Sequence, residues 1–260
     1  SLIKNSPLKR EIIKGTDIVF FRELMGGIYF GKKELSKDGQ SAFDVCSYTV
    51  EEISRITHLA FKASQSRRKK VTLIDKANVL ETSRLWRKTV TEIAKQYKDV
   101  TLEYLFVDNA AMQIILNPKQ FDVILTENLF GDIISDEASV IGGSIGLLAS
   151  SSLGNENALF EPIHGSYPQA KGKDIANPLA SILSAAMLLE HLGLDEEANA
   201  IERAVEKSLI LNITTEDIKG KNKYPASTSK VGDFIADYIL NQEDSNLNFM
   251  NIHAGQSTII

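Results

Sequence analysis

The stretch that decides the fold of this chain is FDVILTENLFGDIISD, residues 121–136. Its first part, up to Leu125, is a short apolar run rich in Val, Ile and Leu, which predicts a buried strand. The apolar run gives way to Thr-Glu-Asn at 126–128, and sequence compatible with a helix begins near Gly131. A buried strand that leads into a helix is the repeating unit of an α/β sheet.

Two carboxylates lie in this expected helix. Asp132 and Asp136 are four residues apart, so both project from one helix face, one turn from each other. The pair favours a divalent cation, because Mg²⁺ commonly uses one or two carboxylates together with substrate and water oxygens. Solvated helix faces carry similar pairs, and the spacing alone leaves that alternative open. The position supports a site, because α/β sheets bind ligands at the carboxyl ends of their strands.

The rest of the chain alternates between strands and helices. Strands are predicted at 17–21, 71–74 and 100–107, and helices at 49–70, 83–98, 177–193 and 229–240, with another helix starting at Asp195. Thr49 and Glu52 form a capping box at the start of the first helix. The basic run 67–70 at the end of that helix is interpreted as complementing the helix dipole. The alternation predicts an α/β architecture.

Two segments interrupt this pattern. Residues 141–152 turn to Gly, Ser and Ala, which is typical of a crossing between domains or a tight loop. Residues 241–260 are polar and aperiodic, and we expect a mobile tail there. Residues 1–9 read as a loop, and we expect that the chain begins partway through a longer protein.

The composition limits the class of protein. Hydrophobic residues make up 43% and charged residues 24%, as in soluble globular proteins. The net charge of -5 argues against nucleic acid or an anionic membrane as a partner, and no apolar stretch is long enough to cross a bilayer. The single cysteine, Cys46, excludes an intramolecular disulfide framework and fits a reducing compartment, so we expect a cytoplasmic location.

Polar side chains stand where the predicted strands end: Arg22, Lys76, Asp108 and the pair Asp132 and Asp136. Each has an ordinary explanation by itself, as an ion-pair partner, a surface lysine or a helix cap. Together they put two cations and three carboxylates at one edge of a sheet, which suits a small anionic substrate held through a divalent metal. Arginine grips carboxylates bidentately, and a lysine beside a metal and another cation can act as a base.

Five segments carry a resemblance to a known family. They are RELMGGIYFG at 22–31, DKANVLE at 75–81, VDNAAMQ at 107–113, TENLFGDIISDEAS at 126–139 and EPIHGS at 161–166. In this order they resemble the metal-dependent β-decarboxylating dehydrogenases, over a region reaching to about Leu240. The Leu and Gly-Gly between Arg22 and Tyr29 resemble the isopropylmalate branch more than the isocitrate or tartrate branches.

The resemblance implies the two-domain α/β fold of isopropylmalate and isocitrate dehydrogenases, with a mixed sheet shared by the domains. Residues 1–142 would form the substrate, metal and dimerisation domain, and 143–240 the remaining half of the cofactor domain, whose N-terminal portion is absent. The implied reaction is the oxidative decarboxylation of 3-isopropylmalate with NAD, in leucine biosynthesis. The alternatives are a relative acting on isocitrate, tartrate or malate, and a non-catalytic subunit or fragment of such an enzyme.

The resemblance also implies roles for single residues. Arg22 and Asp108 would bind the substrate, Lys76 would be the general base for the C2 hydroxyl, and Tyr29 would protonate the enol left by decarboxylation. Without the resemblance, an aromatic residue after Gly-Gly reads as packing at the base of a loop. We expect poor turnover of isopropylmalate by the 260-residue chain alone.

The metal, the partner and the cofactor are implied in the same way. Asp108, Asp132 and Asp136 would ligate Mg²⁺ or Mn²⁺, and Lys76 and Asp108 would come from the second subunit of a homodimer. NAD would contact residues between the middle and the end of the chain: Gly146, His164, Gly165, Ser166, Gln169 and Asn177. Many NAD-using members of the family carry an Asp at the position of Gln169, and Gln169 lacks the charge by which that Asp repels a 2′-phosphate. No added Arg or Lys pair for NADP is evident there, although Lys171 and Lys173 lie nearby, so NAD stays the expected cofactor.

Overall fold

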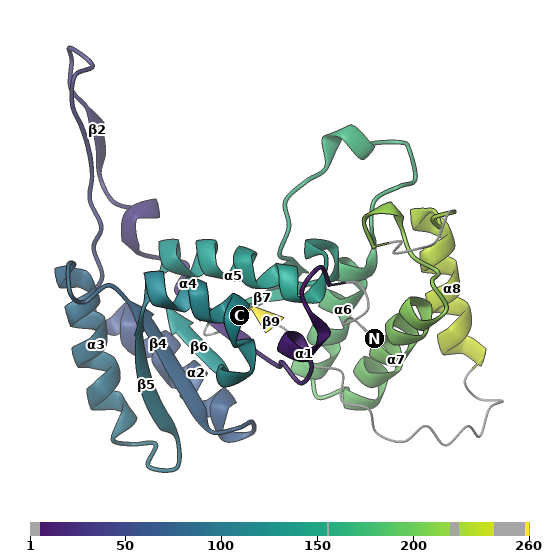
Figure 1. Cartoon of the computed structure of the whole chain (residues 1–260), viewed down its shortest axis with the longest axis horizontal. Coiled ribbons are helices and arrows are strands. Elements are labelled where there is room, and N and C mark those ends of the chain that lie inside the picture. Colours follow the sequence, from purple (N-terminus) through teal and green to yellow (C-terminus); the bar gives the residue numbers. More distant parts are fainter. Residues whose placement is uncertain (1–5, 155, 219–223, 242–257, 260) are drawn as a thin grey trace. The chain divides into compact units, whose positions relative to one another are not determined.

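The computed structural model of the chain describes residues 6–154, 156–218 and 224–241, together with a strand at 258–259 (Figure 1). The chain divides into two compact units: residues 15–138, and a second unit made of 6–14 with the chain from 139 onward. Both units combine helices and strands, and the expected α/β fold class is confirmed. The first unit ends within a helix, α5 (Asn128–Gly142). The assignment of substrate and cofactor domains to 1–142 and 143–240 stays a prediction.

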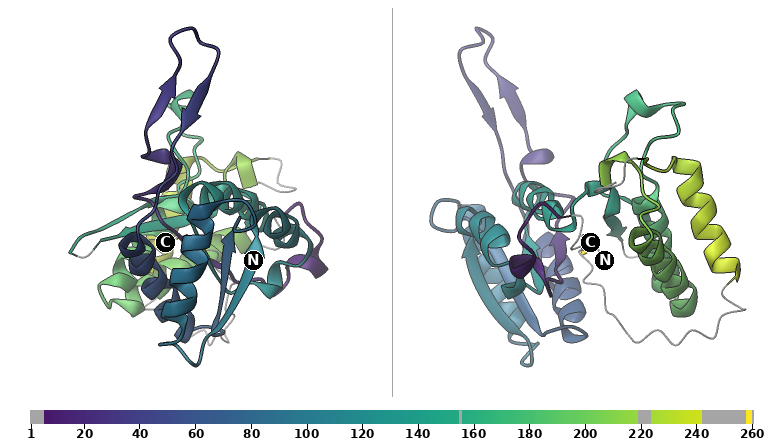
Figure 2. Two further views of the ribbon diagram at one scale, coloured as in Figure 1. Left: turned by 90° about the vertical axis from the view of Figure 1, so that its left-hand side faces the viewer. Right: turned by 45° about the vertical axis from the view of Figure 1, so that its right-hand side comes forward.

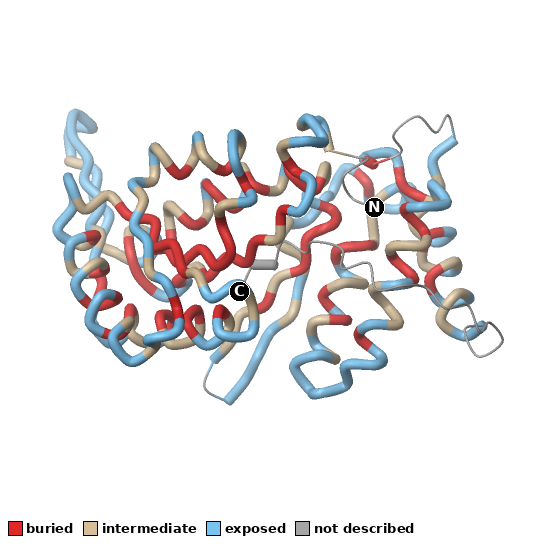
Figure 3. Tube along the Cα trace, turned by 60° about the horizontal axis from the view of Figure 1, so that its bottom comes forward, coloured by how far each residue is buried: buried red, intermediate tan, exposed pale blue. Residues whose placement is uncertain are grey.

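A parallel sheet forms the centre of the unit 15–138. Its strands pair in the order β5-β4-β6-β1, where β1 is Val19–Arg22, β4 is Lys70–Asp75, β5 is Thr101–Phe106 and β6 is Val123–Thr126. All four residues of β6 are buried, and so is β4 after its first residue (Figure 3). Burial on both faces explains why these strands read as continuous apolar runs without alternation.

The helices α2 (Val50–Gln65), α3 (Glu81–Ala94) and α4 (Val107–Leu116) pack against this sheet. The same unit also contains η2 (Gly27–Tyr29), η3 (Pro118–Gln120) and the first part of α5. The predicted capping box is confirmed: Glu52 N donates to Thr49 Oγ1 at 3.2 Å, and Thr49 N donates to the Glu52 carboxylate at 2.6 Å. Trp86, on the inner face of α3, is 2% exposed.

The basic run after α2 does something other than complement a helix dipole. The helix ends at Gln65, before the basic residues begin. Arg67 Nε donates to Asp122 Oδ1 at 2.9 Å, and Arg68 donates to the backbone carbonyl of Phe121. Asp122 is 1% exposed, and a buried carboxylate requires such partners. The dipole interpretation is wrong, because these side chains tie the segment before β4 to the segment before β6.

A hairpin stands away from the rest of this unit (Figures 1 and 2). It consists of β2 (Lys33–Leu35) and β3 (Ala42–Asp44), which pair with each other in an antiparallel ladder. All six strand residues are exposed, including Leu35 and Phe43. The sequence analysis did not predict this hairpin.

The second unit carries a further group of elements. They are α1 (Arg10–Ile13), η4 (Ile145–Leu147), β7 (Ala149–Leu153), β8 (Ala158–Pro162), η5 (Pro168–Ala170), α6 (Leu179–His191), α7 (Asp195–Ile210), η6 (Glu216–Ile218), α8 (Thr228–Leu240) and β9 (Thr258–Ile259). Strand β7 pairs with β8 in an antiparallel ladder and with β9 in a parallel one. Leu147, Leu179, Val205 and Val231 meet in its core.

The sequence predictions for this unit are met in part. The helices expected from 177, 195 and 229 are present as α6, α7 and α8. The Gly/Ser/Ala segment 141–152 contains η4 and most of β7 as well as loops. The mobile tail expected at 241–260 lies outside the described residues except for Asn241 and β9. Among the helices that the structure describes, none is both long and apolar enough to cross a membrane.

Candidate active site

The polar clusters predicted at strand ends do share one edge of the parallel sheet. Arg22 is the last residue of β1 and pairs in register with Thr126, the last residue of β6. Lys76 directly follows β4, and Asp108 lies one residue beyond the start of α4, just after β5. Because all four strands are parallel, their carboxyl ends meet at this edge. The order β5-β4-β6-β1 puts three strand spacings, about 14 Å, between the ends of β1 and β5, which separates Arg22 from Asp108. Lys76 follows β4, which pairs with β6. The side-chain contacts at this edge fall into two groups.

The first group gathers on Asp132. Arg22 Nη1 lies 2.6 Å from Asp132 Oδ1, and the Tyr29 hydroxyl donates to Asp132 Oδ2 at 2.9 Å. The Arg22 guanidinium also lies 5.6 Å from the centre of the Tyr29 ring. Partial burial raises the pKa of Tyr29, and its hydrogen bond to Asp132 adds to this effect. Tyr29 is 43% exposed, so it does not simply pack at the base of the loop.

Asp136 completes the carboxylate pair on α5. Burial raises the pKa of Asp136, and the charge of Asp132 raises it further. The two carboxylates therefore repel each other, and a cation between them would relieve that repulsion. Two hard oxygen donors one helix turn apart fit Mg²⁺ or Mn²⁺. Within the described part of the chain, no group of three or more His, Cys, Asp or Glu is placed to hold a metal ion. Asp108 does not join the pair within one chain.

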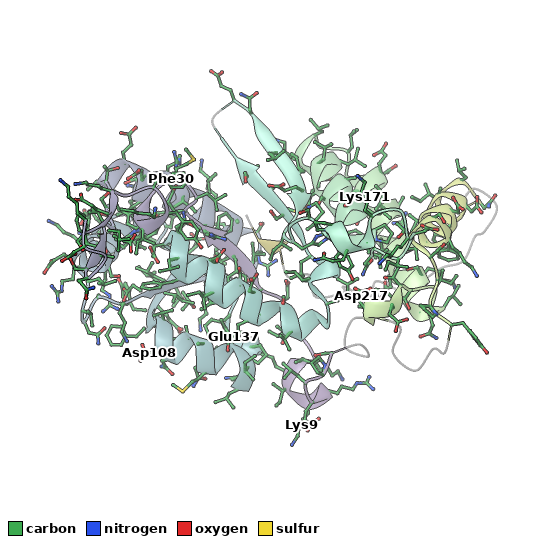
Figure 4. All side chains as sticks on the ribbon, turned by 90° about the horizontal axis from the view of Figure 1, so that it is seen from above. Lys9, Phe30, Asp108, Glu137, Lys171 and Asp217 are labelled. Carbon is green, nitrogen blue, oxygen red and sulfur yellow. The ribbon has the colours of Figure 1, made fainter. Side chains whose placement is uncertain are left out.

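The second group consists of Lys76 and Asp108. Lys76 Nζ donates to Asp108 Oδ1 at 2.6 Å, and this hydrogen bond lowers the pKa of Asp108. The Asp108 side chain is 64% exposed and lies at the periphery of its unit (Figure 4). The Lys76 ammonium is 5.8 Å from the centre of the Phe106 ring. The base and the carboxylate predicted from sequence are thus adjacent and open to solvent.

A buried ion pair lies behind the second group, and the sequence analysis missed it. Asp75 is 2% exposed and accepts two hydrogen bonds of 2.8 Å from Arg87 Nε and Nη2. Asp75 also accepts from the backbone N–H of Ala77 at 3.0 Å, which fixes the turn that carries Lys76. Arg87 in turn lies over the rings of Tyr104 and Phe106. Nothing in the sequence spacing links Asp75, the last residue of β4, with Arg87 in the middle of α3.

The side chains that hold Arg22 and its neighbour Glu23 were not predicted from the sequence. Asn128 Oδ1 accepts from Arg22 Nε at 3.0 Å and from Nη2 at 2.8 Å. Beside it, Glu23 is 2% exposed and accepts from Arg55 Nη2 at 2.8 and 2.9 Å. The available signal was a polar Glu-Asn pair at 127–128 between a buried strand and a helix, which resembles an ordinary helix start.

In the second unit, the structure brings together two of the predicted cofactor residues. A Cβ on Gly146 would lie 2.9 Å from Asn177 Nδ2, so only glycine allows this approach. Asn177 Nδ2 donates to Asp217 Oδ2 at 3.0 Å, and Ser144 Oγ donates to the same oxygen at 2.7 Å. Asp217, labelled in Figure 4, was not predicted from the sequence. The Asp217 carboxylate fixes the amide of Asn177 next to Gly146, which has no side chain. This arrangement fits a bound nucleotide.

The other predicted cofactor residues lie on the loop between β8 and α6. His164 Nδ1 is 3.0 Å from the carbonyl oxygen of Gly165, a local contact. Gly165, Ser166 and Gln169 are exposed. These positions are open to a ligand, and their role stays a prediction.

Comparisons with known proteins identify relatives of this chain. The family model described as isocitrate/isopropylmalate dehydrogenase matches residues 1–235. A 3-isopropylmalate dehydrogenase from Wolinella succinogenes is 55% identical over 91% of this chain and 66% of its own length. One from Clostridium acetobutylicum is 54% identical over 88% of this chain and 66% of its length. The chain thus spans about two thirds of the length of these relatives.

Two solved structures of related dehydrogenases are also similar to this chain. An isocitrate dehydrogenase from Methylococcus capsulatus superposes with a TM-score of 0.80 and 38% identity, covering 85% of this chain and 66% of that protein. A β-decarboxylating dehydrogenase from Thermococcus kodakarensis superposes with a TM-score of 0.75 and 37% identity, covering 89% of this chain and 67% of that protein.

Proposed function

Because the chain belongs to the isocitrate/isopropylmalate dehydrogenase family, we propose that the protein catalyses the NAD-dependent oxidative decarboxylation of 3-isopropylmalate, a step of leucine biosynthesis. The relatives named for this activity, at 50–55% identity, support this substrate over isocitrate, tartrate or malate. The observation that carries the proposal is the convergence of Arg22 and Tyr29 on Asp132 at the carboxyl edge of the sheet. Arg22 would bind the substrate's carboxylate there, Tyr29 would donate a proton, and Asp132 would ligate the metal.

The reaction assigns one task to each of these side chains. Arg22 binds a carboxylate of the substrate, for which its planar fork of N–H groups is suited. Lys76 accepts the proton of the C2 hydroxyl as the C2 hydride leaves. Tyr29 gives its proton to C3 of the enol that remains after the bond to the carboxylate carbon breaks. A raised pKa keeps the Tyr29 hydroxyl protonated at neutral pH, as a proton donor requires.

A divalent metal ion and NAD would supply the rest of the chemistry. A bound Mg²⁺ or Mn²⁺, held by Asp132 and Asp136 with Asp108, would polarise the C2 oxygen as a Lewis acid. NAD, held by Gly146 and Asn177 with the loop 163–170, would accept the hydride. The carboxylate pair and the glycine close to Asn177 are the observations that support these sites.

We further propose that the protein works as a homodimer in which the partner subunit supplies Lys76 and Asp108. Two observations support this: among the described residues of one chain, Asp108 forms no metal-holding group with Asp132 and Asp136, and the ends of β1 and β5 are about 14 Å apart. Exposed apolar side chains give a surface to bury: Leu35 and Phe43 on the hairpin, and Met112 and Leu116 on α4. The cytoplasmic location expected from the composition stays a prediction.

The test is to measure NADH production by the intact protein with Mn²⁺ and four acids side by side. We expect 3-isopropylmalate to be used with a higher kcat/KM than isocitrate, tartrate or malate. Tyr29→Phe is the matched control, because it keeps the ring over Arg22 and removes only the hydroxyl that donates to Asp132. A preference for another acid would favour the related enzymes. No NADH with any acid would favour a non-catalytic subunit.

A further inference from the structure

The guanidinium of Arg22 is held by side chains from two elements, Asn128 and Asp132 on α5 and Tyr29 on η2. A guanidinium carries five N–H groups. Nε and one hydrogen of Nη2 go to Asn128 Oδ1, and one hydrogen of Nη1 goes to Asp132. Arg22 also makes a side-chain hydrogen bond with the Tyr29 hydroxyl. The guanidinium is thus held in one orientation, and its planar fork is suited to the two oxygens of a carboxylate.

Asn128 can hold the guanidinium in this orientation because it is itself fixed. It is 2% exposed. Its side-chain Nδ2 donates to the carbonyl oxygens of Leu24 and Gly26, both at 3.2 Å. These two bonds use both hydrogens of the amide and turn Oδ1 toward Arg22. The amide therefore has one orientation that satisfies all of its partners.

The buried side chains of Tyr48 and Glu127 hold the backbone at Asn128 in place. The backbone N–H of Asn128 donates to the Tyr48 hydroxyl at 3.0 Å, and that hydroxyl donates to Glu127 Oε2 at 2.8 Å. Glu127 Oε1 accepts from the backbone N–H of Phe130 at 2.8 Å. Tyr48 and Glu127 are 8% and 7% exposed, so the chain of hydrogen bonds runs in a dry interior where each bond is stronger than in water.

The stem of Arg22 is seated just as closely. A Cβ on Gly131 would lie 2.7 Å from Arg22 Cγ and 3.0 Å from Cδ, closer than such atoms approach. Gly131 thus makes room for the aliphatic part of Arg22 between β1 and the first turn of α5. The stem is confined by packing and the head by Asn128.

We propose that Asn128 is a positioning residue, which fixes the orientation of the Arg22 guanidinium for the substrate's carboxylate before the substrate arrives. This inference rests on the proposed function. Asn128 need not touch the substrate: it acts through Arg22. Its value is pre-organisation, because an arginine that already points in the bound direction loses little side-chain freedom on binding. The buried Tyr48 and Glu127 serve the same end by keeping Asn128 in place.

The test is a double-mutant cycle in the intact protein. Asn128→Leu has a similar size and no acceptor for Arg22, and we expect it to raise KM for 3-isopropylmalate by about tenfold or more, as for a hydrogen bond to a charged group. KM for NAD should stay unchanged. Asn128→Asp keeps an acceptor for Nε and Nη2 but loses the two hydrogen bonds to the carbonyl oxygens of Leu24 and Gly26, so it should recover only part of the affinity for the acid.

Arg22→Lys supplies the second arm of the cycle. If Asn128 acts through the guanidinium, Asn128→Leu should cost little more affinity once Arg22 is already replaced by lysine. Asp122→Asn is the control for general destabilisation, because it weakens a buried ion pair at the opposite edge of the sheet and should leave both KM values as they are. The Arg22 Nε–H proton, followed by NMR without substrate, should exchange slowly in the wild type and fast in Asn128→Leu.

The outcomes separate this inference from the proposed function. Equal losses from Asn128→Leu in the wild-type and Arg22→Lys backgrounds would overturn the positioning role and leave the reaction standing. Fast exchange of the Arg22 Nε–H proton in Asn128→Leu, together with an unchanged KM for 3-isopropylmalate, would also overturn the positioning role and leave the reaction standing. A wild-type protein that binds none of the four acids would overturn both the function and the role that depends on it.

Discussion

Gly27→Ala offers a sharp test of how the candidate site is supported. Gly27 has φ +76, in the left-handed region, and a Cβ there would lie 2.1 Å from the Tyr48 hydroxyl oxygen. The substitution therefore does two things: it strains the backbone, and it drives the Tyr48 ring out of its place. The displaced hydroxyl loses its hydrogen bonds with Glu127 and with the backbone of Asn128.

These contacts set the size of the effect. The left-handed conformation costs a residue with a side chain about 1 kcal/mol. Two hydrogen bonds contribute about 1 kcal/mol each, and the buried Glu127 oxygen left without a partner costs about 1 kcal/mol more. The sum is about 4 kcal/mol. Gly15→Ala is the matched control, because Gly15 has φ +80 and nothing within 4 Å of the added Cβ, so only the strain of about 1 kcal/mol applies.

The protein carries its own probe for this measurement. Trp86 is the only tryptophan, and its ring meets that of Tyr48 edge to face at 5.5 Å between centres. Its fluorescence therefore follows unfolding of the unit 15–138. We expect Gly27→Ala to lower the unfolding midpoint by about 8–16 °C and Gly15→Ala by about 2–4 °C. Equal shifts of the unfolding midpoint for the two variants would refute the proposed steric clash between a Cβ at position 27 and Tyr48.

Four further predictions concern the metal, the cofactor, pH and assembly. Asp132→Asn should abolish Mn²⁺ uptake measured by calorimetry on the intact dimer, and an undiminished heat would rule out the metal assignment. Gln169→Asp should sharpen the preference for NAD over NADP, which equal KM ratios for the two proteins would contradict. Burial raises the pKa of Glu127, so the native state binds its proton more tightly than the unfolded chain does. The wild-type free energy of unfolding should therefore fall as pH rises from about 4.3 through the raised pKa, whereas Glu127→Gln removes that slope in urea unfolding. Phe43→Asp on the exposed hairpin should weaken self-association in sedimentation equilibrium, and an unchanged association constant would argue against a role in the dimer.

Much of the fold was predictable because its signals are local. The apolar run at 123–125 predicts a strand, and Thr49 with Glu52 predicts a helix start. Each signal lies within a few residues, and both predictions are confirmed. Since parallel strands end at one edge, the order of strands and helices also predicted that Arg22, Lys76 and Asp108 share that edge.

The rest depends on contacts between residues far apart in the sequence. Tyr48 is 80 residues from Asn128, and no spacing rule connects an aromatic residue before a helix with an amide after a distant strand. The basic run after α2 was misread for the same reason. A local rule offers the helix dipole, while the true partner, Asp122, is 55 residues away from Arg67.

The hairpin β2-β3 has a consequence for how the protein responds to dilution. Among the described residues, no third strand pairs with this ribbon and its strand residues are exposed; such a two-stranded ribbon is only marginally stable in water. If its apolar side chains are sheltered by a second copy, ordering of the ribbon and pairing of the chains form one equilibrium. Proteolytic nicking near Gly39, at the bend of the ribbon, should then accelerate as the protein is diluted, while the parallel sheet beneath stays intact.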